Sequence, residues 1–204
     1  MTAPRFIAPS DVLPNGAAPK SVAGKWRLAK LPGVVGAGQA PGNNSVRLYP
    51  FYINDTVTID QLALAITTIS AAGNAQAAIY ASDPVTQMPT GSALVSSASI
   101  STGATGAVAG AVTPRQFTPG LYWAASNCDN AVAIFLSGSS TSDTIAIAIG
   151  SATLTNVMTT AGPLNGFAVA ATFGTWSDLT SATLTELNTT QRIPVICIHA
   201  QSVP

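Results

Sequence analysis

Charge is the scarcest property of this chain. Lysine, arginine, aspartate and glutamate make up 8% of its 204 residues, whereas a typical soluble domain carries about 25%. The formal net charge is +0, and aromatic residues account for only 6%. A surface made mainly of Ser, Thr, Asn, Gly and Ala protects a free monomer poorly against association. We therefore expect a protein that works inside an assembly; a secreted domain rich in Ser, Thr and Gly is the alternative.

Histidine and cysteine are almost as scarce. The single His199 argues against histidine-rich metal sites, and no CxxC pair or phosphate-binding glycine pattern is present. No GxSxG motif accompanies His199, which we interpret as a surface residue at a strand end, and the carboxylates are expected in turns and caps. We therefore expect no enzyme activity, no cofactor and no metal. Cys128 and Cys197 stand in apolar, strand-like runs and are predicted to be buried free thiols, although they could pair.

Long apolar runs are missing too. No segment approaches the roughly 18 apolar residues that a membrane span requires. The first residues, MTAPRFIAPSDVLPNG, lack the basic-then-apolar order of a signal peptide. We expect no membrane association and a protein made in a cytoplasm. Because 47% of the residues are hydrophobic and the net charge is zero, the chain is not of the disordered class.

What the chain does have is an unusual N-terminal region. Pro4, Pro9, Pro14 and Pro19 recur every five residues, which excludes a helix or a central strand. Residues 1–47 hold six basic residues against one acidic residue, whereas the remainder holds two against seven. We predict an extended arm over residues 1–23 that docks on an acidic partner surface. The residues expected to make that contact are Arg5, Phe6, Lys20, Lys25 and Arg27. They form no basic run and have no interleaved aromatics, so nucleic-acid binding is not expected.

Residues 24–204 have the pattern of strands. Eight to ten short apolar segments, each bounded by Gly, Pro, Asn, Asp or Ser, follow one another at fairly even spacing. This pattern predicts an all-β fold, a jelly-roll-like β-sandwich with the extended N-terminal arm in front of it. Only residues 177–190 leave room for a short helix.

Individual residues refine this prediction. Pro50 inside VRLYPFYI predicts an edge or bulged strand. Alternation in VTIDQLALAITTIS puts Ile59, Gln61, Ala63 and Ala65 on one face and Leu62, Leu64 and Ile66 on the other. Pro119-Gly120 predicts a type II turn that starts the next strand, on which Trp123 is expected to be a core residue.

Several motifs together resemble a known family. GKW, LYPFYINDTVTIDQLALAITT, AAIYASD and FTPGLYWAAS, between Gly24 and Ser126, resemble a β-sandwich module of bacteriophage virion surface proteins, tail-fibre-like or head-decoration-like. The closing IPVICIHA matches more loosely. The resemblance implies a virion structural protein that is made in the host cytoplasm and contacts other virion proteins. This chain carries the module almost alone, with the proline-rich arm in front, which favours a small protein docked on a larger lattice over a fibre.

The predicted function is therefore a capsid decoration or cement protein, or a short head or tail appendage. It would act as a homo-oligomer, with a trimer as the first expectation. The alternative is a receptor- or glycan-binding module of a phage tail tip. For that alternative, the candidate glycan contact is Trp176, in TFGTWSDLTS; the favoured interpretation of Trp176 is that it covers the end of the sandwich or a subunit interface.

Overall fold

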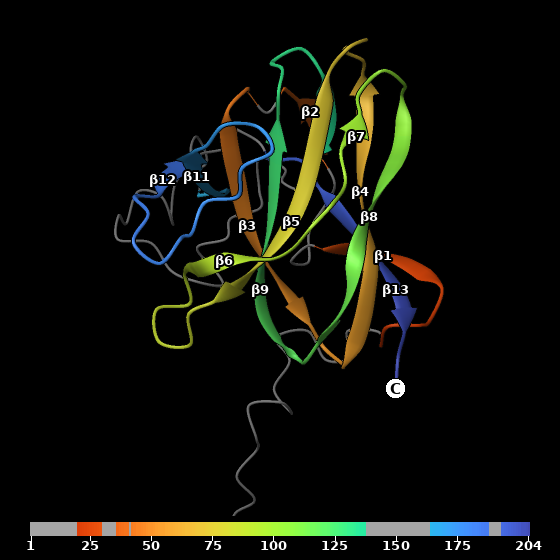
Figure 1. Ribbon diagram of the computed structural model, residues 1–204, viewed down its shortest axis with the longest axis vertical. Helices are drawn as coiled ribbons and strands as arrows, with labels where there is room; N and C mark the ends of the chain where they lie inside the picture. Colours follow the sequence, from red (N-terminus) through yellow and green to blue (C-terminus); the bar gives the residue numbers. More distant parts are fainter. Residues whose placement is uncertain (1–19, 30–35, 41, 138–163, 188–192) are drawn as a thin grey trace, which may run out of the picture.

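A computed structural model describes residues 20–29, 36–40, 42–137, 164–187 and 193–204, and these residues form two antiparallel sheets (Figure 1). The first sheet contains β1 (Lys25–Ala29), β2 (Gly36–Gln39), β4 (Val57–Thr68), β8 (Gly106–Phe117), β10 (Ile134–Ser137) and β13 (Ile196–Ser202). The second contains β3 (Ser45–Ile53), β5 (Asn74–Ser82), β6 (Pro89–Ser96), β7 (Ile100–Ser101), β9 (Gly120–Cys128), β11 (Gly166–Ala170) and β12 (Thr185–Leu187). No helix occurs within the described residues, and the predicted all-β sandwich is confirmed.

The long strand β4 organises the first sheet. β8 pairs along one side of it, and β13 and then β10 pair along the other. β1 lies beyond β13 and β2 beyond β10. In the second sheet, β9 occupies the corresponding central position, between β3 and β5.

The main core fills the space between the two sheets. Leu62, Leu64 and Ile66 of β4 face Phe51, Ile53 and Ile79 of the second sheet across it, all essentially inaccessible to water. Tyr49 adds a polar tie, because its buried hydroxyl accepts the Ile196 backbone N–H of the opposite sheet at 2.8 Å. Burial raises the pKa of Tyr49 well above its ordinary value, so the hydroxyl stays neutral.

The second sheet is also covered on its outer face. Trp123 packs there with Tyr80 and Leu48, beneath the segment of residues 164–187 that contains β11 and β12. Trp123 is fully buried, and its indole N–H donates to the Gln87 carbonyl at 3.0 Å. Because both faces of the second sheet are buried, its central strands have near-continuous apolar sequences instead of alternating ones. The core role expected for Trp123 is confirmed, although this core lies outside the sandwich interior.

A β-bulge changes the facing predicted for β4. In the pairing of β4 with β13, the consecutive residues His199 and Ala200 face Gln61 and Ile59, so Asp60 is an extra residue on β4. The extra residue places both Asp60 and Gln61 toward the outer face, while Ile59 lies in the core with Leu62. The prediction that Ile59 and Gln61 share a face was therefore wrong. Alternation across a strand holds only while the ladder is regular, and the bulge interrupts it.

Other local predictions have mixed outcomes. Pro50 lies within β3 beyond Leu48, the last residue paired with β11, so its missing N–H leaves no ladder bond unmade on that side. β9 begins at Gly120 as expected, but Gly120 lacks the positive φ that a type II turn would require. Within 177–190, the described part contains turns and β12 instead of a helix. Cys128 is a buried free thiol, and Cys197 is free but only half-buried.

The bulge predicts opposite outcomes for two residues that simple alternation would treat alike. We expect Ile59→Ala to lower the free energy of unfolding by about 2–4 kcal/mol because it opens a cavity in the core. Gln61→Ala, on the outer face, should change it by less than about 0.5 kcal/mol. Urea unfolding followed by tryptophan fluorescence measures both. Similar losses for the two variants would contradict the bulged register.

Candidate functional site: the arm root

The five residues predicted to dock the arm are only partly within the described structure. Arg5 and Phe6 lie outside the described residues. Lys20 and Lys25 are exposed, at the beginning of the described chain and on β1. Arg27 is different: it lies half-buried on β1 and its side chain is engaged within the molecule.

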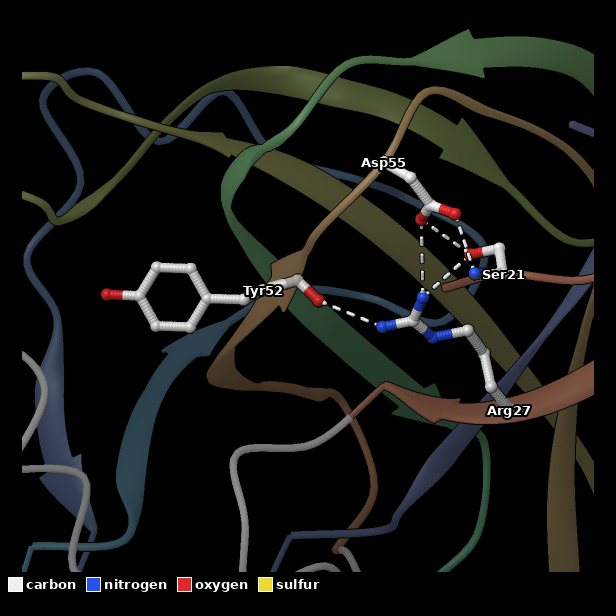
Figure 2. Close-up of polar contacts among 4 residues, drawn as sticks. All are labelled: Ser21, Arg27, Tyr52 and Asp55. Carbon is white, nitrogen blue, oxygen red and sulfur yellow. Dashed lines mark hydrogen bonds and ion pairs between the residues drawn. The ribbon is translucent and has the colours of Figure 1, made fainter. Parts of the chain in front are cut away.

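Arg27 belongs to a polar cluster that ties the start of the described chain to the sandwich (Figure 2). Asp55, in the turn between β3 and β4, accepts the Ser21 backbone N–H at 2.6 Å and the Ser21 hydroxyl at 2.8 Å. Arg27 Nη1 donates to Ser21 Oγ at 2.7 Å and lies 3.8 Å from Asp55 Oδ1. Arg27 Nη2 donates to the Tyr52 carbonyl oxygen at 3.3 Å. We call Ser21, Arg27, Asp55 and the Tyr52 carbonyl the arm-root cluster.

The arm-root cluster joins the two sheets at one side of the sandwich. Arg27 comes from β1 of the first sheet, and Tyr52 from β3 of the second. Asp55 neutralises the guanidinium, and both side chains are largely shielded, with 24% and 13% of their surfaces exposed. Hydrogen bonds to a charged group are stronger than neutral ones, so this contact fixes the point at which residues 1–19 join the body.

Sequence reasoning missed Ser21 and Asp55 as members of this site. Asp55 was expected only as a turn residue, and Ser21 was placed in the arm. The two are 34 residues apart, and no spacing rule links them. Ser21 contacts the sandwich although it lies inside the segment 1–23 that was assigned to the arm.

His199 occupies a second polar site, on the outer face of the first sheet. Its Nδ1 lies 2.6 Å from Asp60 Oδ1, and its ring centroid lies 5.0 Å from that of Trp26. Only 17% of the His199 side chain is exposed, so the expectation of a simple surface residue was wrong. The bulge in β4 turns Asp60 toward this face, and a one-residue shift cannot be read from the sequence.

This histidine–carboxylate pair lacks an activated nucleophile among the described residues. No hydroxyl group is recorded as a hydrogen-bond partner of His199. Cys197 stands two residues earlier on β13, and burial raises the pKa of its thiol, which disfavours the thiolate. The described residues also hold no cluster of three or more His, Cys, Asp or Glu able to bind a metal.

Trp176, the candidate glycan contact, packs against the covered outer face of the second sheet. Its ring meets Tyr80 edge-on, with centroids 6.4 Å apart, and the Tyr80 hydroxyl donates to the Ser177 carbonyl at 3.0 Å. Trp176 is half-buried, and its Nε1 is inaccessible and has no hydrogen-bond partner. Only the exposed part of the Trp176 side chain could therefore contact a sugar.

Comparisons with protein-family models, curated proteins and solved structures returned no match. Within the described residues, no helix is long and apolar enough to cross a membrane.

The arm-root cluster predicts a specific effect of Asp55→Ala. The change leaves the Ser21 amide and hydroxyl without their acceptor and the Arg27 guanidinium without its counter-charge, so we expect the free energy of unfolding to fall by about 1–3 kcal/mol. Hydrogen exchange at the Ser21 amide should accelerate at least tenfold. Asp83→Ala is the control, because Asp83 accepts similar hydrogen bonds within its own exposed turn. Unchanged Ser21 exchange in Asp55→Ala would contradict the cluster.

The packing of Trp176 also predicts a cost on truncation. Trp176→Ala removes a ring that covers Tyr80, and we expect the free energy of unfolding to fall by about 2 kcal/mol. Thermal unfolding measures this, and a glycan array with the same variant separates packing from recognition. An unchanged melting temperature together with lost binding to a glycan would instead establish Trp176 as a contact residue.

Proposed function

We propose that this chain is a structural component of a bacteriophage particle, a capsid decoration or cement protein or a short head or tail appendage, attached through its N-terminal arm. The observation that carries the proposal is the arm-root cluster. A charge-assisted contact fixes the base of a proline-rich segment on the side of the sandwich. Because the base of the segment is fixed, a partner that binds the N-terminal arm also holds the sandwich.

The distribution of charge supports attachment through the arm. Six basic residues lie in 1–47, whereas the rest of the chain is acidic. Arg27 is paired with Asp55 inside the body, so the positive charges left for a partner include Lys20, Lys25 and Arg5. A segment that orders on binding buries a large area per residue, which suits attachment to a lattice.

The body supports a non-enzymatic, binding role. Its described polar side chains are engaged mainly in turns and in contacts between strands, as Asp83 and Asp178 are. The partners we propose are other virion proteins and further copies of this chain, with the trimer still a prediction, and the location we propose is the virion, after synthesis in the host cytoplasm.

Deleting residues 1–19 tests the arm without touching Ser21. We expect the truncated chain to keep its far-UV circular dichroism and melting temperature, because it retains both sheets and the contacts of Ser21 with Asp55. The assay uses virus particles from which the native protein has been removed and to which a tagged form of the chain is added. The amount of truncated chain that sediments with these particles should be at least tenfold lower than that of the full-length chain.

A Gly/Ser segment of equal length in place of residues 1–19 is the matched control for tether length. It should fail to attach, as the deletion does. Normal attachment of either variant would contradict the arm model, and absence of the chain from every density-banded particle of its source would contradict the virion assignment.

A further inference from the structure

β1 combines an open strand edge with exposed apolar side chains. Among the described strands it pairs only with β13, through five consecutive register pairs without a bulge. Trp26 and Leu28 point to the outer face and are 45% and 43% exposed, and Val22 just before them is 58% exposed. These are three of the six large hydrophobic side chains exposed in the described residues. Figure 1 shows β1 beside β13 at one side of the molecule.

The other edge strands carry more of the features that block pairing than β1 does. β2, at the opposite end of the first sheet, has four residues and an irregular pairing with β10. β8 is interrupted by a register shift and contains Pro114 and Arg115. β7 and β12 are only two and three residues long, and the pairing of β6 is irregular. Short strands, prolines, charges and bulges are the usual means of keeping an edge from pairing. β1 has one exposed charge, Lys25 at its first position, while the charge of Arg27 is turned inward to Asp55; it contains no proline and its pairing has no bulge.

We propose that the β1 edge pairs with β1 of a second copy of this chain, antiparallel and about a two-fold axis at Arg27. In that register Trp26 of each copy faces Leu28 of the other on the outer face, an aromatic–aliphatic cross-strand pair. The backbone N–H and C=O groups along a regular strand edge are best paired by another β-strand. The contact deepens the proposed function, since it supplies the self-association that an assembly protein needs.

Charge favours a second copy over other strands. In a two-fold contact every group meets its own kind, so an unpaired charge would repel its copy. The outer-face residues of β1 are uncharged, and the neighbouring Asp60 and His199 contact each other. Lys25 is exposed, but in this register it faces Ala29 of the other copy, so the two Lys25 side chains lie at opposite ends of the contact. Each Arg27 brings its own Asp55, which offsets the approach of the two guanidinium groups. The arm is a poor occupant, because a proline at every fifth position interrupts a regular ladder.

The full-length chain tests the contact through its mass in solution. Sedimentation over a range of concentrations should show an even-numbered species: a dimer, or a hexamer if trimers form through another surface. Leu28→Lys should halve that mass or weaken the association at least tenfold. Ile69→Lys is the matched control and should leave the mass unchanged, because Ile69, directly after β4, is similarly exposed (45% against 43% for Leu28).

Crosslinking tests the register. Trp26→Cys and Leu28→Cys chains, each in a Cys197→Ser background because Cys197 is the register partner of Leu28, should form a disulfide dimer efficiently when mixed. Each chain alone should crosslink much less. Circular dichroism confirms that the variants fold, and Trp26→Lys serves as a second disruptive variant.

Three results would overturn the inference: an odd-numbered or monomeric wild type at every concentration, a mass unaffected by both lysine variants on β1, or equal crosslinking of mixed and single chains. None of these readouts involves a particle. A failure here therefore differs from a failure of the proposed function, which is decided by attachment after removal of residues 1–19.

Discussion

Burial of the second sheet on both faces is the constraint on which the rest of the structure depends. β3, β5 and β9 are packed against the first sheet on one side and against residues 164–187 on the other. Trp123 and Tyr80 fill the outer layer, and each finds a backbone carbonyl for its polar atom. With this sheet held from both sides, the first sheet is left to present an outer face and an open edge. Among the described residues, those that we assign to contact with other molecules, apart from Trp176, lie on or beside that first sheet.

The side of the sandwich at β1 then acquires two opposite properties. Inward, Arg27 and Asp55 close the gap between the sheets with a shielded, charge-assisted contact that also holds Ser21. Outward, Trp26 and Leu28 stay uncovered on a regular strand edge. Alternation of side chains along β1 separates the two roles. The five-residue strand β1 thus contributes both to the arm-root cluster and to the proposed contact between copies. The proposed attachment and the proposed self-association would therefore both act through β1.

The bulge at Asp60 shows how one irregularity reorganises a face. The extra residue keeps Ile59 in the core and brings Asp60 to the outer face, where it meets His199. Without that shift, an acidic residue would point toward an apolar interior at high cost. His199 therefore serves as the polar partner of Asp60, which the bulge brings to this face. Trp26 packs against the same histidine ring.

The sequence by itself determined the fold class, the strand-rich body, the absence of a histidine-rich metal site and the contrast between a basic N-terminal region and an acidic remainder. These follow from composition and short-range pattern: proline spacing, turn residues and strand-length apolar runs such as those around Trp123. The strand start at Gly120 was predictable for the same reason. The edge or bulged strand expected around Pro50 was not found, because β3 lies between β11 and β9 without a register shift.

Only the tertiary structure decided which side chains meet. The contact of Ser21 with Asp55, that of His199 with Asp60 and the cover of Trp176 over Tyr80 join residues 34, 139 and 96 positions apart, set by strand pairing and layer stacking. The facing of Ile59 depended on a bulge that leaves no mark in the sequence. Periodicity reports which residues prefer to be buried, whereas the partners of a polar or charged group depend on register, and one residue of register reverses the face of every side chain beyond it.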